Sequence, residues 1–126
     1  MMGAAAKEPS VDDPENSLFY LEFPATDLPA TKRFFTEVFG WSFTDWGPGY
    51  TSFKAGEMAG GFTTDAAGPG GAPLAVIFNK DLEAARDRVV QGGGKIVKDI
   101  FGFPGGRRFH FADPNGNELA VCTDVE

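Results

Sequence analysis

Apolar and polar positions along the chain follow the same order twice. Residues 18–23 and residues 74–78 are short apolar runs of the kind that form strands. Asp27 and Asp81 follow these runs, and each precedes a stretch in which apolar residues recur at helical spacing. Extended runs then return in both halves of the chain. The pattern predicts an internal repeat, which in so short a chain indicates a duplicated module with a cleft.

The two predicted helices carry start and stop signals. Aspartate is a favoured N-cap residue, so Asp27 and Asp81 mark the helix starts, and Pro29 is tolerated in the first turn. Gly40 ends the first helix and the glycines at 92–94 end the second, because glycine readily adopts the left-handed backbone common at helix ends.

Three further strands are predicted after each helix. They cover residues 41–45, 50–54 and 58–64 in the first half, and 95–100, 107–112 and 117–123 in the second. Residues 101–106 are predicted to form a loop, and residues 102–106 within it are either a flexible lid or an ordinary long connection. One strand, a helix and three strands, repeated, favour an α+β fold.

The chain is long enough for one domain with a hydrophobic core, since 42% of its 126 residues are hydrophobic. Residues 1–16 read as a disordered leader because they combine alanine, proline and acidic residues. Residues 17–64 form the first predicted module and residues 73–124 the second. Residues 65–72, rich in alanine, glycine and proline, are predicted to link them.

The first strand has two unlike faces. Side chains of a strand alternate between its faces, so one face of residues 18–23 is wholly apolar and is expected to pack under a helix. The other face mixes apolar and polar side chains and is expected to look into the cleft. The two sets are Phe19, Leu21 and Phe23, and Leu18, Tyr20 and Glu22.

Charge and cysteine usage narrow the class of protein. Eleven basic and 18 acidic residues give a net charge of -7, which argues against nucleic acid and anionic membranes as partners and is compatible with a cationic ligand. Cys122 is the only cysteine, so no disulfide forms within the chain, and a cytoplasmic location is expected. No apolar run reaches the roughly 20 residues that span a bilayer.

Five short segments, seen together with the repeat, carry a resemblance to a known family. They are residues 23–28, 34–41, 80–85, 92–94 and 111–117, the last reading Phe-Ala-Asp-Pro-Asn-Gly-Asn. The chain resembles the vicinal oxygen chelate superfamily over about residues 17–124. This superfamily includes glyoxalase I, bleomycin resistance proteins and extradiol dioxygenases.

The resemblance implies two tandem βαβββ modules that form curved mixed sheets around a concave pocket. In relatives this pocket binds a small molecule, often at a divalent metal held by His, Glu or Gln side chains. By analogy the protein is expected to be a homodimer. Some relatives pair the modules between chains and others within one chain, and the sequence leaves this choice open.

The usual metal ligands are missing at the positions that the resemblance implies. These positions carry Tyr20, Leu74 and Ala120, and a fourth lies in the strand 58–64, which contains no His, Glu, Gln or Asp. We therefore expect no metal cofactor, because a divalent ion needs several nitrogen or oxygen donors. Glu22, His110 and Glu118 are an alternative donor set, but one His with two carboxylates is uncommon.

Several residues are candidates for the chemistry of the pocket. Glu22 and Tyr20 are the candidate catalytic acid or base, although Glu22 is as well explained by a salt bridge to Arg107 or Arg108 or by exposure at the strand end. His110, the only histidine, is a candidate for ligand binding or an ordinary structural residue. The full predicted ligand-binding set is Tyr20, Glu22, Trp46, Tyr50, Phe53, Leu74, His110, Ala120 and Cys122.

Three functions are compatible with these residues. The first is a small-molecule-binding protein like the bleomycin resistance proteins, taking a planar or cationic ligand without the usual metal. The second is a lyase, isomerase or dioxygenase related to glyoxalase I, acting without metal or with nonstandard ligands. The third is an accessory domain whose cleft is filled by its own side chains.

Overall fold

The computed structural model describes residues 15–65 and 71–125 and confirms the α+β fold of two tandem modules. The predicted leader lies almost wholly outside these residues, as does most of the predicted linker. The elements are β1 (Leu18–Pro24), α1 (Leu28–Phe39), β2 (Ser42–Asp45), β3 (Tyr50–Ala55), β4 (Met58–Thr63), β5 (Leu74–Phe78), α2 (Leu82–Gln91), β6 (Lys95–Phe103), β7 (Gly106–Ala112) and β8 (Glu118–Thr123).

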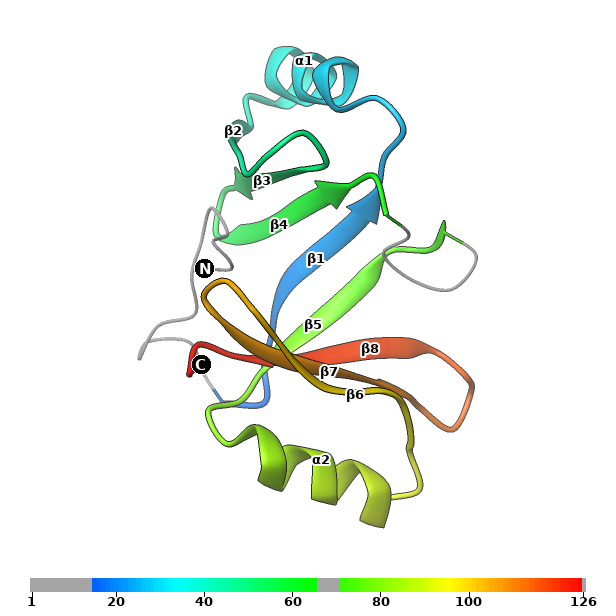
Figure 1. The fold of residues 1–126 in the computed structure, drawn as a ribbon. Helices are drawn as coiled ribbons and strands as arrows, with labels where there is room; N and C mark the ends of the chain where they lie inside the picture. The colour runs from blue at the N-terminus through cyan, green and yellow to red at the C-terminus, as the bar shows by residue number, and fades with distance from the viewer. Residues whose placement is uncertain (1–14, 66–70, 126) are drawn as a thin grey trace.

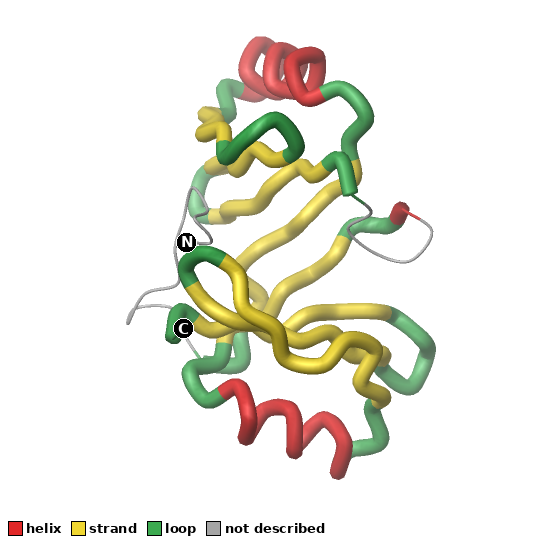
Figure 2. The backbone as a smooth tube through the Cα atoms, in the orientation of Figure 1, coloured by secondary structure: helices red, strands yellow, loops and turns green. Residues whose placement is uncertain are grey.

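The strands form one sheet in the order β2-β3-β4-β1-β5-β8-β7-β6. Strand β1 pairs in parallel with β4, and β5 pairs in parallel with β8, so the two modules have the same internal order. Antiparallel pairing of β1 with β5 joins the modules within one chain. The helices lie at opposite ends of the molecule, outside the curved sheet (Figures 1 and 2). We call the sheet face turned away from the helices the concave face.

The helix boundaries follow local signals. Asp27 and Asp81 cap their helices by accepting hydrogen bonds at 3.0 Å from the backbone N–H groups of Ala30 and Ala84. Gly40 takes a left-handed backbone with φ of 75°, which ends α1. These ends confirm the predicted helices. They were predictable because capping depends on residues only a few positions apart in the sequence.

Aromatic rings fill the core between α1 and the sheet. The ring centres of Phe35 and Trp41 lie 4.6 Å apart, and those of Trp41 and Phe53 also lie 4.6 Å apart, so Trp41 is stacked against both phenylalanines. Phe62 adds a ring 5.4 Å from Phe35. Under α2 the core is mainly aliphatic, with Leu82, Ala85, Phe109 and Val121 at its centre.

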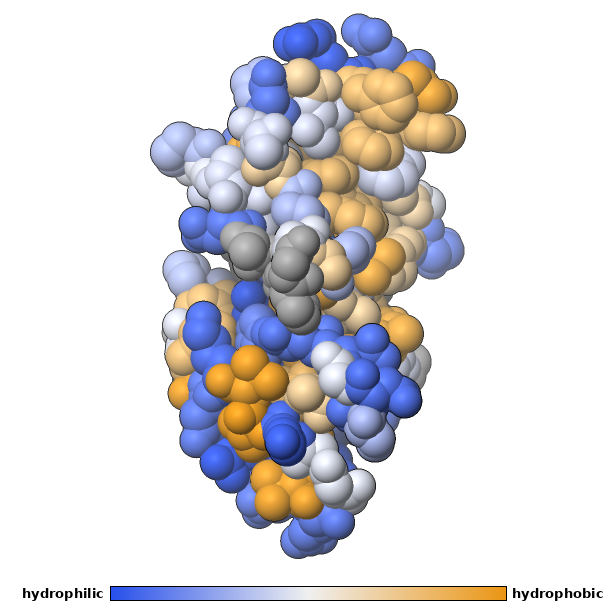
Figure 3. All heavy atoms as spheres, turned by 90° about the vertical axis from the view of Figure 1, so that its right-hand side faces the viewer, coloured by the Kyte–Doolittle hydropathy of each residue, from blue (hydrophilic) through white to orange (hydrophobic). Residues whose placement is uncertain are grey.

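The outer surface of α1 is apolar as well. Phe34, Val38 and Phe39 are 54%, 56% and 61% exposed. Figure 3 shows apolar surface at the end of the molecule where α1 lies. The helix therefore presents large hydrophobic side chains to solvent, besides those it buries.

Two predictions about local structure are wrong. The expected loop at 101–106 is instead the end of β6 and the start of β7, and the two strands form a hairpin in which Phe101 pairs with Arg108. Phe19 does not pack under a helix, because a register irregularity in β1 shifts it into the same cluster as Tyr20 and Phe78. Glycine content does not exclude a hairpin, and simple alternation does not reveal a register irregularity.

None of the helices among the described residues is long and apolar enough to cross a membrane.

Candidate functional site

Strand register locates the four positions that the resemblance implies for metal ligands. In β1 and β5, Tyr20 lies opposite Val76 and Glu22 opposite Leu74, as expected for two repeated strands. Glu22 also pairs with Gly61 in β4, and its counterpart Val76 pairs with Ala120 in β8. Gly61 is therefore the counterpart of Ala120, an equivalence that the sequence alone left open.

The residues at these four positions do not fit a divalent metal. Tyr20 supplies one hydroxyl, whereas Gly61, Leu74 and Ala120 supply no side-chain donor. Over residues 15–65 and 71–125, no three His, Cys, Asp or Glu side chains converge as a metal-binding group. The alternative donor set of Glu22, His110 and Glu118 is accordingly not brought together as such a group.

A chain of hydrogen bonds occupies this part of the concave face. The hydroxyl of Tyr50 donates to Glu22 Oε2 at 3.0 Å, and the hydroxyls of Tyr20 and Tyr50 lie 2.5 Å apart. A phenol has one proton to donate, so Tyr20 is the donor to Tyr50. Arg108 Nη2 approaches the other carboxylate oxygen, Oε1, at 3.5 Å. The polar chain thus runs from β1 and β3 of the first module to β7 of the second.

Two glycines in β4 make room for aromatic rings. A Cβ on Gly61 would collide with the phenol of Tyr50 and come within 2.8 Å of the Tyr20 hydroxyl. A Cβ on Gly60 would collide with the Phe53 ring on the other face. Gly61 therefore lets Tyr50 cross β4 and reach Glu22. Strand β4 supplies no metal donor, but its glycine supplies the space that the Tyr50 ring occupies.

Both phenols of the chain stay protonated at neutral pH. Burial raises the pKa of Tyr20 far above its ordinary value, and the nearby Glu22 carboxylate adds to the effect. Burial also raises the pKa of Tyr50, followed by the negative charge of Glu22. Tyr20 and Tyr50 are thus hydrogen-bond donors, or acids, and not bases.

His110 forms a second polar centre on the concave face. Its Nδ1 lies 2.8 Å from Glu118 Oε2, and its side chain is only 7% exposed. Burial lowers the pKa of the imidazole, although the hydrogen bond to Glu118 partly opposes this. A neutral ring that donates from Nδ1 to a carboxylate leaves Nε2 as an acceptor.

Arg108 lies beside this centre, among aromatic rings. Its guanidinium carbon is 5.6 Å from the centre of the Phe101 ring and 5.8 Å from that of Phe103. Its neighbour Arg107 points elsewhere and pairs with Glu83 on α2 at 2.6 Å. Arg107 and Arg108 were both predicted as possible partners of Glu22, and Arg108 is the one that contacts it. Arg108 shares strand parity with His110, which is the signal that distinguishes it from Arg107.

The other predicted site residues lie in different surroundings. Trp46 is 45% exposed and donates from Nε1 to Ser52 Oγ at 2.8 Å, which places it on the rim of the first module. Phe53 packs under α1 and so lies on the opposite face from Tyr50. Leu74, Ala120 and Cys122 belong to the buried cluster at the centre of the concave face. Burial raises the pKa of the Cys122 thiol to about 12, so it is not a thiolate at neutral pH.

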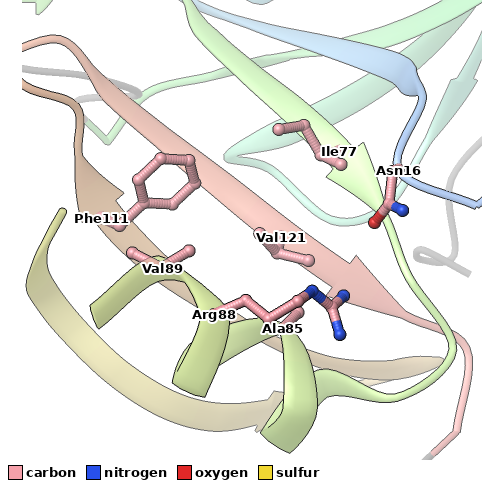
Figure 4. Close-up of a pocket in the computed structure, with 7 residues that line it drawn as sticks. All are labelled: Asn16, Ile77, Ala85, Arg88, Val89, Phe111 and Val121. Carbon is pink, nitrogen blue, oxygen red and sulfur yellow. The ribbon is translucent and has the colours of Figure 1, made fainter. Parts of the chain in front are cut away.

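None of Tyr20, Glu22, Tyr50, Arg108 and His110 lines the following two hollows. One of about 240 Å³ lies between α2 and the sheet, on the opposite face from Tyr20, and its lining is mostly apolar (Figure 4). Its lining residues are Asn16, Ile77, Ala85, Arg88, Val89, Phe111 and Val121. Another, of about 570 Å³, lies where β8 begins and is lined in part by Glu118, the partner of His110.

The fold agrees with comparisons to known proteins. The chain belongs to the Glyoxalase/Bleomycin resistance protein/Dioxygenase superfamily, whose family model matches residues 17–121. This confirms the resemblance inferred from the sequence. Membership establishes the class of protein. It does not assign roles to the site residues described above.

Individual relatives include a sequence match and two solved structures. CFP32 of Mycobacterium bovis, assigned by name to the glyoxylases, is 32% identical over 116 residues, covering 81% of this chain but only 43% of CFP32. A Mn(II)-bound glyoxalase from Novosphingobium aromaticivorans has a TM-score of 0.65 at 20% identity, covering 88% of this chain and 40% of that one. Methylmalonyl-CoA epimerase from Mycobacterium tuberculosis has a TM-score of 0.66 at 13% identity, with 94% of both chains covered. At these identities the structural likeness shows the fold alone.

Proposed function

We propose that the chain binds a small planar molecule on the concave face without the divalent metal used by many relatives. The observation that carries the proposal is the replacement of metal donors by Gly61, Leu74 and Ala120, with a buried polar chain built around Glu22 in their place. A ligand would meet hydrogen-bond donors and acceptors there instead of a Lewis acid.

The concave face does not favour a cationic ligand. Glu22 already contacts Arg108, and Glu118 is paired with His110, so the acidic side chains of this face have partners. The negative net charge of the whole chain therefore does not by itself make the concave face a binding site for cations. Planarity has more support, from the rim ring of Trp46 and the rings of Phe101 and Phe103.

Metal analysis is the first test of this proposal. Protein grown with nickel, zinc, manganese, iron and cobalt, and purified without chelator or affinity tag, is expected to carry far less than one ion per chain by elemental mass spectrometry. A thermal-shift screen of planar aromatic compounds should then raise the unfolding midpoint, since a ligand that binds the native state stabilises it. One tightly held ion per chain, or a flat screen, would overturn the proposal.

A proton-transfer enzyme, an isomerase or lyase, is the second candidate. His110 favours it, because a neutral imidazole oriented by a carboxylate and offering Nε2 is the usual arrangement of a general base. Glu22 and Tyr20 remain candidate acid–base residues, with Tyr20 restricted to the acid role by its raised pKa. Loss of turnover in His110→Gln with turnover retained in Glu22→Gln would assign the base to His110.

A cytoplasmic location and a homodimer complete the proposal. Sedimentation velocity over a wide range of protein concentration tests the dimer, and fractionation of the source cells tests the location.

A further inference from the structure

Two buried polar atoms on β7 have no hydrogen-bond partner within the described part of the chain. They are Nε of Arg108 and Nε2 of His110. Phe109, between them, packs under α2, so both side chains lie on the concave face. Native proteins keep few buried polar groups unsatisfied, because each one loses its bonds to water and gains none in return. Two such atoms on neighbouring side chains of one face indicate a partner other than residues 15–65 and 71–125 of this chain.

The two atoms need different hydrogen-bond partners. Arg108 Nε–H is a donor and needs an acceptor, best supplied by an anionic oxygen. His110 donates from Nδ1 to Glu118, so Nε2 needs a donor such as a hydroxyl group. The Cα atoms of residues two apart on one strand are about 7 Å apart, so these two side chains leave the strand at about that spacing. A carboxylate and a hydroxyl on adjacent carbons, with one hydrogen bond at each end, match that separation.

Aromatic surface lies beside this polar pair. The ring of Phe101 is 5.9 Å from the imidazole of His110, and the rings of Phe101 and Phe103 both lie against Arg108. Both phenylalanines are only partly buried, unlike the packed centre of the concave face. A ligand ring placed here would cover exposed aromatic surface.

We propose that Arg108 and His110 form a subsite for an aryl-substituted 2-hydroxy carboxylate. Arg108 Nε–H donates to the carboxylate, the 2-hydroxyl donates to His110 Nε2, and the aryl group lies along Phe101 and Phe103. The subsite rests on the proposed small-molecule function and names its ligand class. The other charged groups near the imidazole are Glu118, which orients it, and Lys98, whose positive charge also favours an anion.

Titration with mandelate tests the subsite. Phenylacetate lacks only the hydroxyl and benzyl alcohol only the carboxylate, so the three compounds separate the two polar contacts. Mandelate is expected to bind at least tenfold more tightly than either. His110 is the only histidine, so its ring gives a single set of NMR signals. Its Nε2 resonance should move with mandelate and not with phenylacetate.

Matched variants locate the contacts. Arg108→Gln should weaken mandelate about tenfold and leave benzyl alcohol unchanged. Arg107→Gln is the control, because Arg107 is the adjacent arginine but pairs with Glu83 on α2. His110→Phe should make mandelate and phenylacetate bind alike. If His110→Phe does not fold, the Nε2 resonance of the unaltered protein still decides the hydroxyl contact.

The outcomes separate this inference from the proposed function. Planar neutral compounds that bind as well as mandelate, with no effect of Arg108→Gln, would refute the subsite and leave the proposed function standing. Mandelate that binds without moving the His110 signals would refute it too. If neither mandelate nor any planar compound binds, both fall. A tenfold preference for mandelate that depends on Arg108 and not on Arg107 establishes the subsite.

Discussion

At the scale of single residues, Gly61 determines the shape of the polar chain on the concave face. Its missing side chain leaves the space in which the phenol of Tyr50 crosses β4 to reach Glu22. The backbone conformation does not demand glycine here, since Gly61 is not among the glycines with positive φ. Close approach of a neighbouring ring is the whole reason, so the residue can be tested by adding one methyl group.

Gly61→Ala is expected to lower the free energy of unfolding by about 1–3 kcal/mol, because the methyl group forces Tyr50 away from Glu22 and Tyr20. Urea unfolding followed by tryptophan fluorescence measures the change. Gly102→Ala is the control, since its Cβ would meet nothing nearer than 3.9 Å and the change should stay within about 1 kcal/mol of the unaltered protein. Equal effects of the two substitutions would contradict this account of Gly61.

His110 makes stability depend on pH in a stated direction. Burial holds its pKa below the ordinary 6.5, so below about pH 6.5 the unfolded chain takes up a proton more readily than the folded chain. The free energy of unfolding therefore falls as the pH drops through this region. His110→Gln should flatten that fall between about pH 7 and pH 5, as measured by urea unfolding at each pH. Parallel pH profiles for the two proteins would rule out the contribution.

At the scale of elements, α1 has two apolar sides with different roles. On its inner side, Phe35 of α1 stacks on Trp41, which follows the C-cap Gly40. Trp41 in turn stacks on Phe53 of β3, so the three rings join the helix to the sheet. Its outer side shows Phe34 and Val38 to solvent. Adjacent phenylalanines of one helix are thus expected to differ strongly in their contribution to stability.

Phe35→Ala should cost about 3 kcal/mol of unfolding free energy, because it removes a ring packed against Trp41 and Phe62. Phe34→Ala should cost less than about 1 kcal/mol, because that ring is 54% exposed. Thermal and urea unfolding of both variants give the comparison. A larger loss for Phe34 than for Phe35 would show that the outer side of α1 is covered in solution.

At the scale of the whole molecule, pairing of β1 with β5 builds the site within one chain. Glu22 comes from the first module and Arg108 from the second, and their contact follows from that pairing. A partner copy is therefore not needed to complete the polar chain. The homodimer stays a prediction about assembly and is separate from the integrity of the site.

NMR signals of His110 and Tyr50 should be unchanged between about 20 μM and 1 mM protein, whatever the assembly state in sedimentation velocity. The physical reason is that all contacts of these side chains described above come from the same chain. Signals that change in step with dissociation of a dimer would mean that modules pair between chains instead. Sedimentation as a monomer throughout would remove the homodimer.

The elements and several of the site residues were predictable from the sequence, but their grouping was not. Tyr20 and Glu22 were placed on the cleft face by alternation, and the structure joins them through Tyr50. The predicted places of Phe53 and Phe19 are wrong. Phe53 is three residues from Tyr50 on β3 and so lies on the opposite face, and a bulge such as the one beside Phe19 is invisible in an alternation pattern. The sequence names Arg107 and Arg108 together without choosing between them and gives no sign of the role of Gly61, since both answers lie in contacts with distant strands.

The sequence by itself determined where helices begin and end, the repeat, and the absence of metal donors at the implied positions, because caps, glycine stops and strand periodicity act over a few residues. The tertiary structure alone decided which arginine meets Glu22, that Gly61 admits Tyr50, and that His110 and Arg108 share one face with unsatisfied nitrogens. Glu22 and Arg108 are 86 residues apart. Only the register of β1 against β5, and of β5 and β7 against β8, brings such residues within hydrogen-bonding distance.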